Sequence, residues 1–341
     1  MRTIILTAIL PGLLLSACLP ALPPTQATIT PLAPTATTAP VALPTPLPPL
    51  GDPGNPLRLA VVSETSDAAQ LDAAIQLAAR LDELTGVRLQ AEIVPAYEDV
   101  LLGLRNEVIQ IAFLPPLTYL LAQRRNQADV ALLINQFGVY QYGSKFLAHK
   151  DSQFNIYFDP QTNQGTADAP TALGQLSGKR PCWTETDSIS GYILPAGLLE
   201  QNQVSTEPAV LIQSHTAVIR ALHARGICDF GATFAHTGDP RTASSVADLP
   251  GVQEEIVVIW QSDAIIPNTN ISYHPSLPDD LRASLTASFL EIASTQEGLT
   301  LLTNALAFEV QALRAETDSL YDPLRAMIRY TQTDLNGTVG R

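Results

Sequence analysis

The sequence predicts an α/β protein of two lobes, and three observations support this fold class. From residue 57 to about residue 124, buried-strand patterns alternate with amphipathic helix patterns in the order β-α-β-α-β-α. A second alternating series follows, with strands near 179–184, 209–213 and 227–233. About 285 residues follow position 56, and a chain of that length usually divides into more than one hydrophobic centre. We therefore expect two lobes, each with a mostly parallel sheet flanked by helices.

The elements of the first lobe can be taken in order along the chain. An apolar strand over 57–62 leads to a helix over 67–84, which Gly86 ends, and strand 87–94 leads to a helix from Tyr97 to about Asn106. Strand 109–114 precedes a helix that starts near Leu117. Ligands of such sheets bind beyond the carboxyl ends of the strands, so loops 63–66, 95–97 and 115–118 should share one rim.

The segments between and after the two series predict the connection of the lobes. Residues 140–150 and 257–265 are extended and apolar, which is typical of chain segments that cross between lobes. The helices after Pro278 should return to the first lobe and complete it. We expect the first lobe to span 57–145 and 261–341, the latter with the C-terminal helices, and the second lobe to span 146–260.

Residues 1–18 have the pattern of a signal peptide. Arg2 precedes an apolar run from Ile4 to Leu15, which is too short for a spanning helix. The run ends in Leu-Ser-Ala-Cys, which resembles a bacterial lipobox, so Cys18 would become the lipidated first residue and anchor the protein outside the cytoplasmic membrane. The alternative is an ordinary secretory signal with Cys18 inside the discarded peptide.

Residues 19–56 are expected to form a disordered tether. They hold twelve of the 27 prolines, no Lys or Arg, and Asp52 as their one acidic residue, so they have little apolar surface to bury. Their Pro, Thr and Ala content favours extended chain that would hold the folded body away from the membrane.

The charge of the chain excludes some partners. Without Arg2, 18 basic residues stand against 33 acidic ones, a net charge of −15. A surface of this sign repels nucleic acid and anionic lipid. An anionic ligand would therefore have to be bound by local dipoles and hydrogen bonds.

Two cysteines remain if Cys18 is lipidated. Cys182 and Cys228 form an even pair in an oxidising compartment, which predicts a disulfide. Two buried free thiols, each at the start of a strand, are the alternative.

A hydroxyl-rich helix start follows the strand that ends in Trp183. Ser188 and Ser190 can donate hydroxyl hydrogens, and Gly191 lets backbone approach a ligand closely. The free N–H groups of a first helical turn suit phosphate-like oxygens. Taken alone, this start is also an ordinary serine N-cap.

Three other helix starts are candidates for the same cleft. One is Ser214-His215-Thr216, where His215 could donate to an anion or simply lie in a surface capping turn. The others come from the first lobe, at Tyr97 and at Pro116-Leu117-Thr118. Two helix starts from each lobe would then hold a tetrahedral oxyanion without Arg or Lys.

Several segments resemble the phosphate, phosphite and phosphonate-binding proteins of ABC importers. The resemblance runs from about residue 57 to about residue 325 and is carried by residues 111–119, 148–152, 188–192, 214–215, 258–268 and 318–323. It implies the fold of type II periplasmic binding proteins, with two lobes joined by a two-crossing hinge that close over the ligand. The implied partners are a small oxyanion and the permease and ATPase subunits.

The resemblance also implies a set of ligand-binding residues. Tyr97, Tyr142, Ser188, Ser190 and His215 match family contacts by position, and Ile189 stands where a Thr is usual. Pro116, Thr118, Gly191, Tyr192 and Thr269 complete the expected site. Thr269 replaces a common acid, and a second acid expected near residues 235–236 is not evident, which disfavours a phosphonate with an amino group.

The sequence leaves some alternatives to a phosphorus-oxyanion-binding protein open and disfavours others. Related two-lobed proteins bind sulfonates, nitrate-like anions or thiamine precursors, and some present their ligand to a membrane histidine kinase. Motifs of hydrolases, zinc peptidases and phosphate-binding loops do not occur in the sequence, and the five histidines lack metal-ligand spacing. We therefore expect a monomeric binding protein with no enzymatic activity, cofactor or metal.

Overall fold

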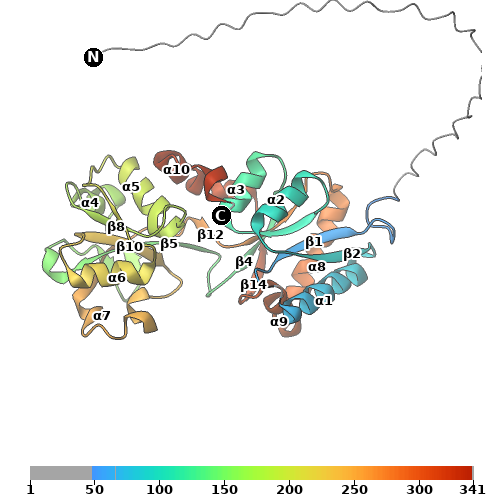
Figure 1. Cartoon of the computed structure of the whole chain (residues 1–341), viewed down its shortest axis with the longest axis horizontal. Coiled ribbons are helices and arrows are strands. Elements are labelled where there is room, and N and C mark those ends of the chain that lie inside the picture. The colour runs from blue at the N-terminus through green and yellow to red at the C-terminus, as the bar shows by residue number, and fades with distance from the viewer. Residues whose placement is uncertain (1–47, 66, 340–341) are drawn as a thin grey trace, which may run out of the picture. The chain divides into compact units, whose positions relative to one another are not determined.

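The computed structural model describes residues 48–65 and 67–339, which form two lobes around two six-stranded sheets (Figure 1). The first sheet has the strand order β14-β4-β13-β3-β1-β2. Its strands are β1 (Leu57–Val62), β2 (Leu89–Val94), β3 (Ile111–Leu114), β4 (Asp129–Asn135), β13 (Asn270–Tyr273) and β14 (Ala312–Ala315). In β1, Leu59 packs on one face and Ala60 on the other, so the strand is covered on both faces and is apolar except for the partly exposed Arg58.

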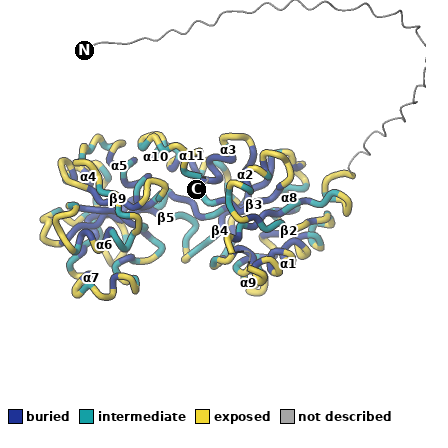
Figure 2. Tube along the Cα trace, viewed as in Figure 1, coloured by how far each residue is buried: buried dark blue, intermediate teal, exposed yellow. Residues whose placement is uncertain are grey.

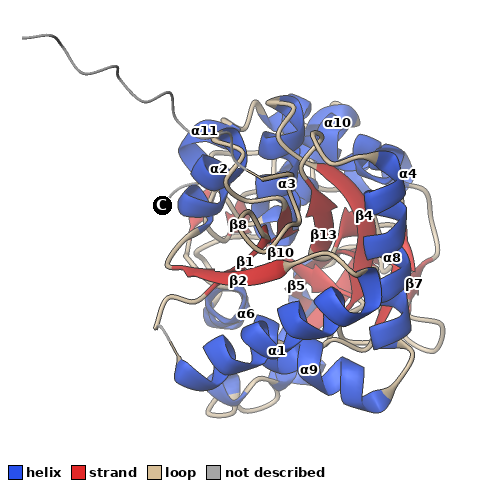
Figure 3. Cartoon of the chain, turned by 90° about the vertical axis from the view of Figure 1, so that its right-hand side faces the viewer, coloured by secondary structure: helices blue, strands red, loops and turns tan. Residues whose placement is uncertain are grey.

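Helices cover both faces of the first sheet, as Figure 3 shows around β1 and β2. One face packs against α1 (Ala68–Thr85), α8 (Asp279–Ala293) and α9 (Gln296–Leu306). The other face packs against α2 (Tyr97–Arg105) and α3 (Pro116–Arg124). Helix α1 begins at its cap Asp67, which accepts from the N–H of Ala69, and Gly86 ends it with a left-handed φ of 73°.

The second sheet has the strand order β11-β5-β10-β8-β9, and β12 pairs with β5. Its strands are β5 (Gln141–His149), β8 (Pro181–Trp183), β9 (Val210–Leu211), β10 (Phe230–Ala235), β11 (Ile256–Gln261) and β12 (Ile266–Pro267). One face packs on α4 (Ala169–Gly174) and α5 (Leu194–Gln201), the other on α6 (His215–Ala224) and α7 (Val252–Glu255). Strands β6 (Phe158–Asp159) and β7 (Gln164–Gly165) form a separate hairpin. Short helical turns span Lys150–Ser152, Pro240–Thr242 and Ser244–Val246.

The expectation of mostly parallel sheets is corrected by the strand pairing. The pairs β1–β2 and β1–β3 are parallel, but β13 lies antiparallel to both β3 and β4, and β14 is antiparallel to β4. In the second sheet β5 is antiparallel to β10, β11 and β12. For β13 the cause is the hinge, because the chain that returns from the second lobe enters the first sheet from the end at which β3 leaves it. The sheets are therefore mixed.

Two crossings of the chain, as the resemblance implies, and one bridging helix connect the lobes. Strand β5 leads from the first sheet into the second, and β12 pairs beside it on the return. The bridging helix is α10 (Asp322–Thr331), which follows the turn Asp318–Tyr321 and packs against α5, with the backbone of Met327 close to Gly197. The predicted lobe boundaries at residues 145 and 260 fall within β5 and β11 and stay a prediction. In Figure 2 the tube is mostly buried inside each lobe and exposed along much of the periphery.

Residues 48–56 differ from the expected tether. The N–H of Arg88 donates to the carbonyl of Gly51 at 2.7 Å, and the N–H of Gly51 donates to the carbonyl of Asn55 at 2.8 Å. These bonds fold the end of the predicted tether into a turn against the first lobe. The signal peptide, Cys18 and the rest of the tether lie outside the described residues. Within residues 48–65 and 67–339, no helix is both long and apolar enough to cross a membrane.

Cys182 and Cys228 are joined as a disulfide, with their Cα atoms 5.6 Å apart. Cys182 lies in β8 and is fully buried against α6. Of the two alternatives that the sequence left open, the structure contains the disulfide, which ties the start of β8 to the segment before β10.

Candidate functional site

A pocket of about 390 Å³ lies where the loops of the first lobe meet residues of the hinge and of the second lobe. The first-lobe residues follow β1, β2 and β3, so the predicted common rim of these three loops is confirmed. The residues that line the pocket are Val62, Glu64, Pro95, Ala96, Tyr97, Glu98, Pro115, Pro116, Leu117, Thr118, Tyr142, Asp187, Ile189, Thr338 and Val339. We refer to this cavity as the rim pocket.

Two helices of the first lobe begin at the rim pocket without a side-chain cap. The cap position of α2 is Ala96, and that of α3 is Pro115, and neither provides a side-chain hydrogen bond. The first N–H groups of a helix have no intrahelical acceptor, so those of Tyr97, Leu117 and Thr118 are free to bind a ligand. They also lie at the positive ends of two helix dipoles. This arrangement suits an anion.

The two predicted tyrosines both line the rim pocket. Burial raises the pKa of Tyr97 to about 12, with a further contribution from the nearby charge of Glu64. Burial alone raises the pKa of Tyr142 to about 12. Both phenols therefore keep their protons at neutral pH and can donate hydrogen bonds to an oxyanion.

The serine-rich turn of the second lobe forms the π-helical segment Ile189–Ile193, which continues into α5. Ser188 is its cap, and the Ser188 hydroxyl accepts from the N–H of Gly191 at 3.2 Å. The hydroxyl hydrogen of Ser188 remains available for another acceptor. A Cβ atom on Gly191 would collide with the side chain of Thr184, which explains why glycine stands there.

Ile189 is the member of the predicted serine turn that lines the rim pocket, next to Asp187. Ser188, Ser190 and Gly191 are not among the lining residues, and the side chain of Ser190 is buried. Tyr192 lines a neighbouring cavity. The structure therefore brings five predicted residues together, namely Tyr97, Pro116, Thr118, Tyr142 and Ile189.

His215 occupies the first position of α6, after its cap Ser214. Burial lowers the pKa of His215 to about 4, so the ring is neutral at neutral pH. Its Nδ1 atom is buried and has no hydrogen-bond partner among residues 48–65 and 67–339, and its ring packs edge-on against Phe234. His215 and Thr269 do not line the rim pocket.

Sequence reasoning missed two groups of lining residues. The carboxylates of Glu64, Glu98 and Asp187 stand on exposed positions at the rim, where no Lys or Arg joins the lining. Thr338 and Val339 come from a distant part of the chain, and no pattern near them indicates a site. The position of Glu64 could have been found, because it lies in loop 63–66, which the sequence predicts at the rim, and Glu98 follows loop 95–97 in the first turn of α2.

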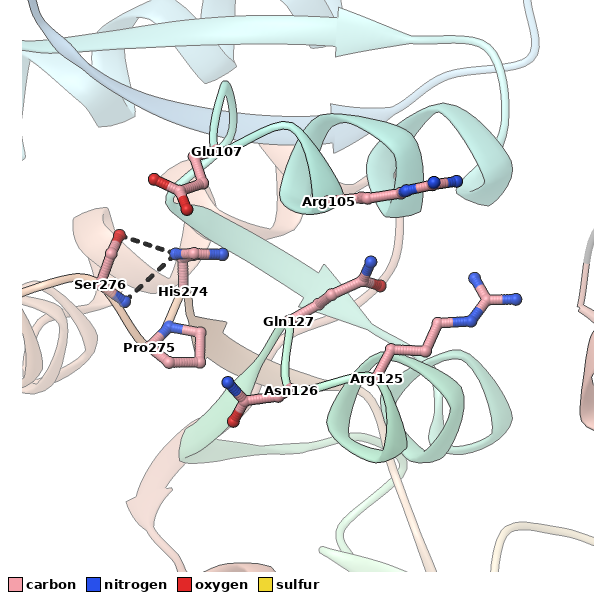
Figure 4. A pocket seen from close by; sticks show the side chains of 8 residues that line it. All are labelled: Arg105, Glu107, Arg125, Asn126, Gln127, His274, Pro275 and Ser276. Atoms are coloured by element: carbon pink, nitrogen blue, oxygen red, sulfur yellow. Dashed lines mark hydrogen bonds between the residues drawn. The ribbon is translucent and has the colours of Figure 1, made fainter.

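A larger cavity of about 850 Å³ lies elsewhere on the first lobe (Figure 4). Arg105 and Arg125 line it together with Gln127, and the His274 ring bonds the hydroxyl of Ser276 at 2.7 Å. It lies at the C-terminal ends of α2 and α3, where the helix dipoles disfavour an anion. None of the predicted ligand residues is in it. The rim pocket is therefore the stronger candidate despite its smaller volume.

Comparison with known proteins identifies a family for most of the chain. A family model described as "ABC transporter, phosphonate, periplasmic substrate-binding protein" matches residues 59–321. No curated protein sequence matches the chain significantly.

Similar solved structures include XAC2383 from Xanthomonas citri. Bound to chloride ion, it matches over 81% of this chain and 98% of its own, with a TM-score of 0.57 and 16% identity. The same protein bound to ATP matches over 83% of this chain and 98% of its own, with a TM-score of 0.56 and 17% identity. Mh-p37 from Mycoplasma hyorhinis matches over 82% of this chain and 98% of its own, with a TM-score of 0.51 and 7% identity. At these identities the likeness shows the fold alone, which is the two-lobed fold expected from the sequence.

Proposed function

Because this chain belongs to the family of phosphonate substrate-binding proteins of ABC transporters, we propose that it captures a phosphorus oxyanion in the rim pocket for import. Members of this family are solute-binding transport proteins that act outside the cytoplasm with permease and ATPase subunits. The ligand we propose is phosphate, phosphite or a phosphonate.

The observation that carries this proposal is the convergence of two uncapped helix starts on the rim pocket. The N-termini of α2 and α3 offer free N–H groups there, and Tyr97 and Tyr142 add protonated phenols. These groups donate hydrogen bonds without adding full charges. A tetrahedral oxyanion has enough acceptor oxygens for several such donors at once.

Hinge closure would complete the site. The ligand would bind first to the helix starts of the first lobe, and the second lobe would then swing about β5 and β12. This movement would bring the hydroxyls of Ser188 and Ser190 and the ring of His215 to the ligand. Binding stabilises the closed form by its differential affinity, and the permease would recognise that form.

The proposed anchor is a lipid on Cys18, in the Leu-Ser-Ala-Cys sequence. Expression in a bacterial host with a radiolabelled fatty acid tests it, because the wild-type chain should be labelled and sediment with membranes. The Cys18→Ser variant should be neither labelled nor membrane-bound. Equal behaviour of the two chains would overturn the anchor without affecting the binding site.

Thermal unfolding of residues 19–341, the secreted chain without its lipidated Cys18, tests the ligand class. The panel consists of phosphate, phosphite, methylphosphonate and 2-aminoethylphosphonate, with sulfate, ethanesulfonate and a thiamine precursor as competing classes. Ligand at about a hundred times its dissociation constant should add about 2.7 kcal/mol of stability. Stabilisation by a phosphorus oxyanion but not by sulfate supports the proposal. Stabilisation by another class alone would keep the fold and overturn the ligand.

A further inference from the structure

Residues 332–339, which we call the strap, follow α10 and reach the rim pocket. The side chains of Thr338 and Val339 line this pocket together with those of the first and second lobes. The family match ends at residue 321, so the strap lies outside the part of the chain that the family model describes. The strap therefore adds a wall to the pocket that the family pattern does not predict.

The strap is held against the first lobe by apolar packing of Leu335 and Val339 and by a polar contact of Asn336. Leu335 is 5% exposed and packs in the same core cluster as Tyr119 of α3. Arg125 Nη2 donates to Asn336 Oδ1 at 2.7 Å. These contacts place the short helix α11 (Leu335–Thr338) beside α3, one of the two helices that begin at the pocket.

Local hydrogen bonds fix the shape of the strap. Gln332 ends α10 with a left-handed φ of 53°, which turns the chain back. The Asp334 side chain accepts from the N–H of Asn336 at 3.0 Å, and the Asp334 carbonyl accepts from the N–H of Thr338 at 3.0 Å. The N–H of Val339 donates to Leu335, also at 3.0 Å. These bonds fix the backbone of residues 334–339, and the Thr338 hydroxyl also donates to the Asp334 carbonyl at 2.7 Å.

The other side of the strap faces the second lobe. A neighbouring cavity of about 840 Å³ is lined by strap residues, including Gln332 and Gly337, and by residues 184–187 of the loop before the serine turn. The strap therefore lies between α3 and a segment that belongs to the second lobe. A ligand substituent that extends from the rim pocket towards residues 338–339 would meet the strap.

We propose that the strap limits the size of the organic substituent of the ligand, and that Thr338 and Val339 are specificity-determining residues. This inference rests on the proposed function. The helix starts of α2 and α3 would hold the oxyanion, and Val339 would join Leu117 and Ile189 in an apolar wall against the substituent. A methyl group would fit beside this wall, whereas a butyl or phenyl group would meet the strap.

Calorimetric titration with methyl-, butyl- and phenylphosphonate tests the inference. The ratio of the dissociation constants for butyl- and methylphosphonate isolates the substituent from the oxyanion. The Thr338→Gly/Val339→Gly variant should lower this ratio by about tenfold or more, since one methylene in an apolar pocket changes binding by at least that factor. Leu335→Ala, which removes the anchor of the strap, should lower it as well. Val339→Trp, which fills the pocket, should raise the ratio.

Tyr330→Ala serves as a matched control, because Tyr330 is exposed on α10, just before the strap, and does not line the pocket. The ratio of the dissociation constants for butyl- and methylphosphonate should be the same in Tyr330→Ala as in the wild type. A ratio that changes by less than about twofold in both the glycine variant and Val339→Trp would overturn the inference. If the wild type binds methylphosphonate, such a result removes the strap inference alone. If the wild type binds phosphate or phosphite but no phosphonate, the strap inference fails and the proposed function stands. If it binds no phosphorus oxyanion, the proposed function fails and the strap inference with it.

Discussion

The Ser144 hydroxyl of strand β5 donates a hydrogen bond to the carbonyl oxygen of Ser190 at 2.8 Å, and both residues are buried. The bond joins the strand that crosses between the lobes to the serine turn that would complete the ligand site. A change in the direction of β5 would therefore be passed on to this turn. The hinge and the site are connected by one polar contact.

Ser144→Ala should destabilise the protein by about 1–3 kcal/mol, because it leaves the Ser190 carbonyl buried without a donor. The measurement is urea unfolding, with Ser152→Ala as control, since Ser152 is an exposed serine of the turn after β5. An equal, near-zero effect of both variants would mean that the Ser144 bond does not hold the turn.

Gly191→Ala should destabilise the protein by about 1–3 kcal/mol through overpacking. The added Cβ atom would collide with the Thr184 side chain and lie 2.9 Å from Ser188 Oγ. The double variant Gly191→Ala/Thr184→Ala should recover most of this loss, because Thr184 Oγ1 has no hydrogen-bond partner that would be missed. Thermal unfolding of the two single variants and the double variant gives the coupling, and additive losses would contradict the collision.

His215 should make the protein less stable as the pH falls from about 6.5 to about 4. Its pKa is lowered to about 4 in the folded chain, so over this range the unfolded state binds a proton that the folded state does not. The part of the unfolding free energy that depends on the neutral His215 ring is fully present above the ordinary pKa of histidine. Lowering the pH to about 4 removes about 3 kcal/mol of it. Urea unfolding near pH 7.5 and near pH 4.5 should show a smaller pH effect in His215→Gln than in the wild type. The same pH effect in both chains would mean that a group other than His215 causes the pH dependence of the stability.

The exposed carboxylates at the rim should weaken the binding of a phosphorus dianion. Glu64→Gln should tighten methylphosphonate binding by a few fold, and raised ionic strength should tighten wild-type binding by screening the repulsion. Glu297→Gln, an exposed carboxylate at the start of α9, is the matched control and should leave the affinity unchanged. Weaker binding in Glu64→Gln would show that Glu64 accepts a proton or a cationic group of the ligand instead.

Reduction of the disulfide should lower the unfolding free energy by about 2–4 kcal/mol, because Cys182 and Cys228 close a long loop with a sequence separation of 46. Guanidinium unfolding with and without dithiothreitol measures this loss. The Cys182→Ala/Cys228→Ala variant should be insensitive to dithiothreitol. Equal sensitivity of wild type and variant would assign the effect to something other than this bond.

The first lobe could be predicted from sequence as far as local patterns determine it. The apolar run of β1, the helical spacing of α1 and the stop at Gly86 are local features, and all three agree with the structure. The antiparallel entry of β13 could not be predicted, because it depends on where the chain returns from the second lobe. A periodicity of apolar residues carries no information on strand direction.

Part of the candidate site could also be predicted from patterns within short segments of the sequence. Tyr97 and Thr118 lie at helix starts that their own segments indicate, and Tyr142 was placed by resemblance. Thr338 reaches the pocket only through the packing of α10 on α5 and of Leu335 on α3. Such contacts join residues far apart in the sequence, so no pattern within residues 332–339 could reveal them.

The most direct test of the rim pocket is an amide ¹H–¹⁵N correlation spectrum of the labelled secreted chain during titration with methylphosphonate. The N–H signals of Tyr97, Leu117 and Thr118 should shift most, because these first-turn groups would donate to the oxyanion. The amides of residues 105–107 and 125–127, at the larger cavity, should not move. Shifts that cluster at residues 105–107 and 125–127 while those of Tyr97, Leu117 and Thr118 stay unchanged would contradict the rim pocket as the ligand site.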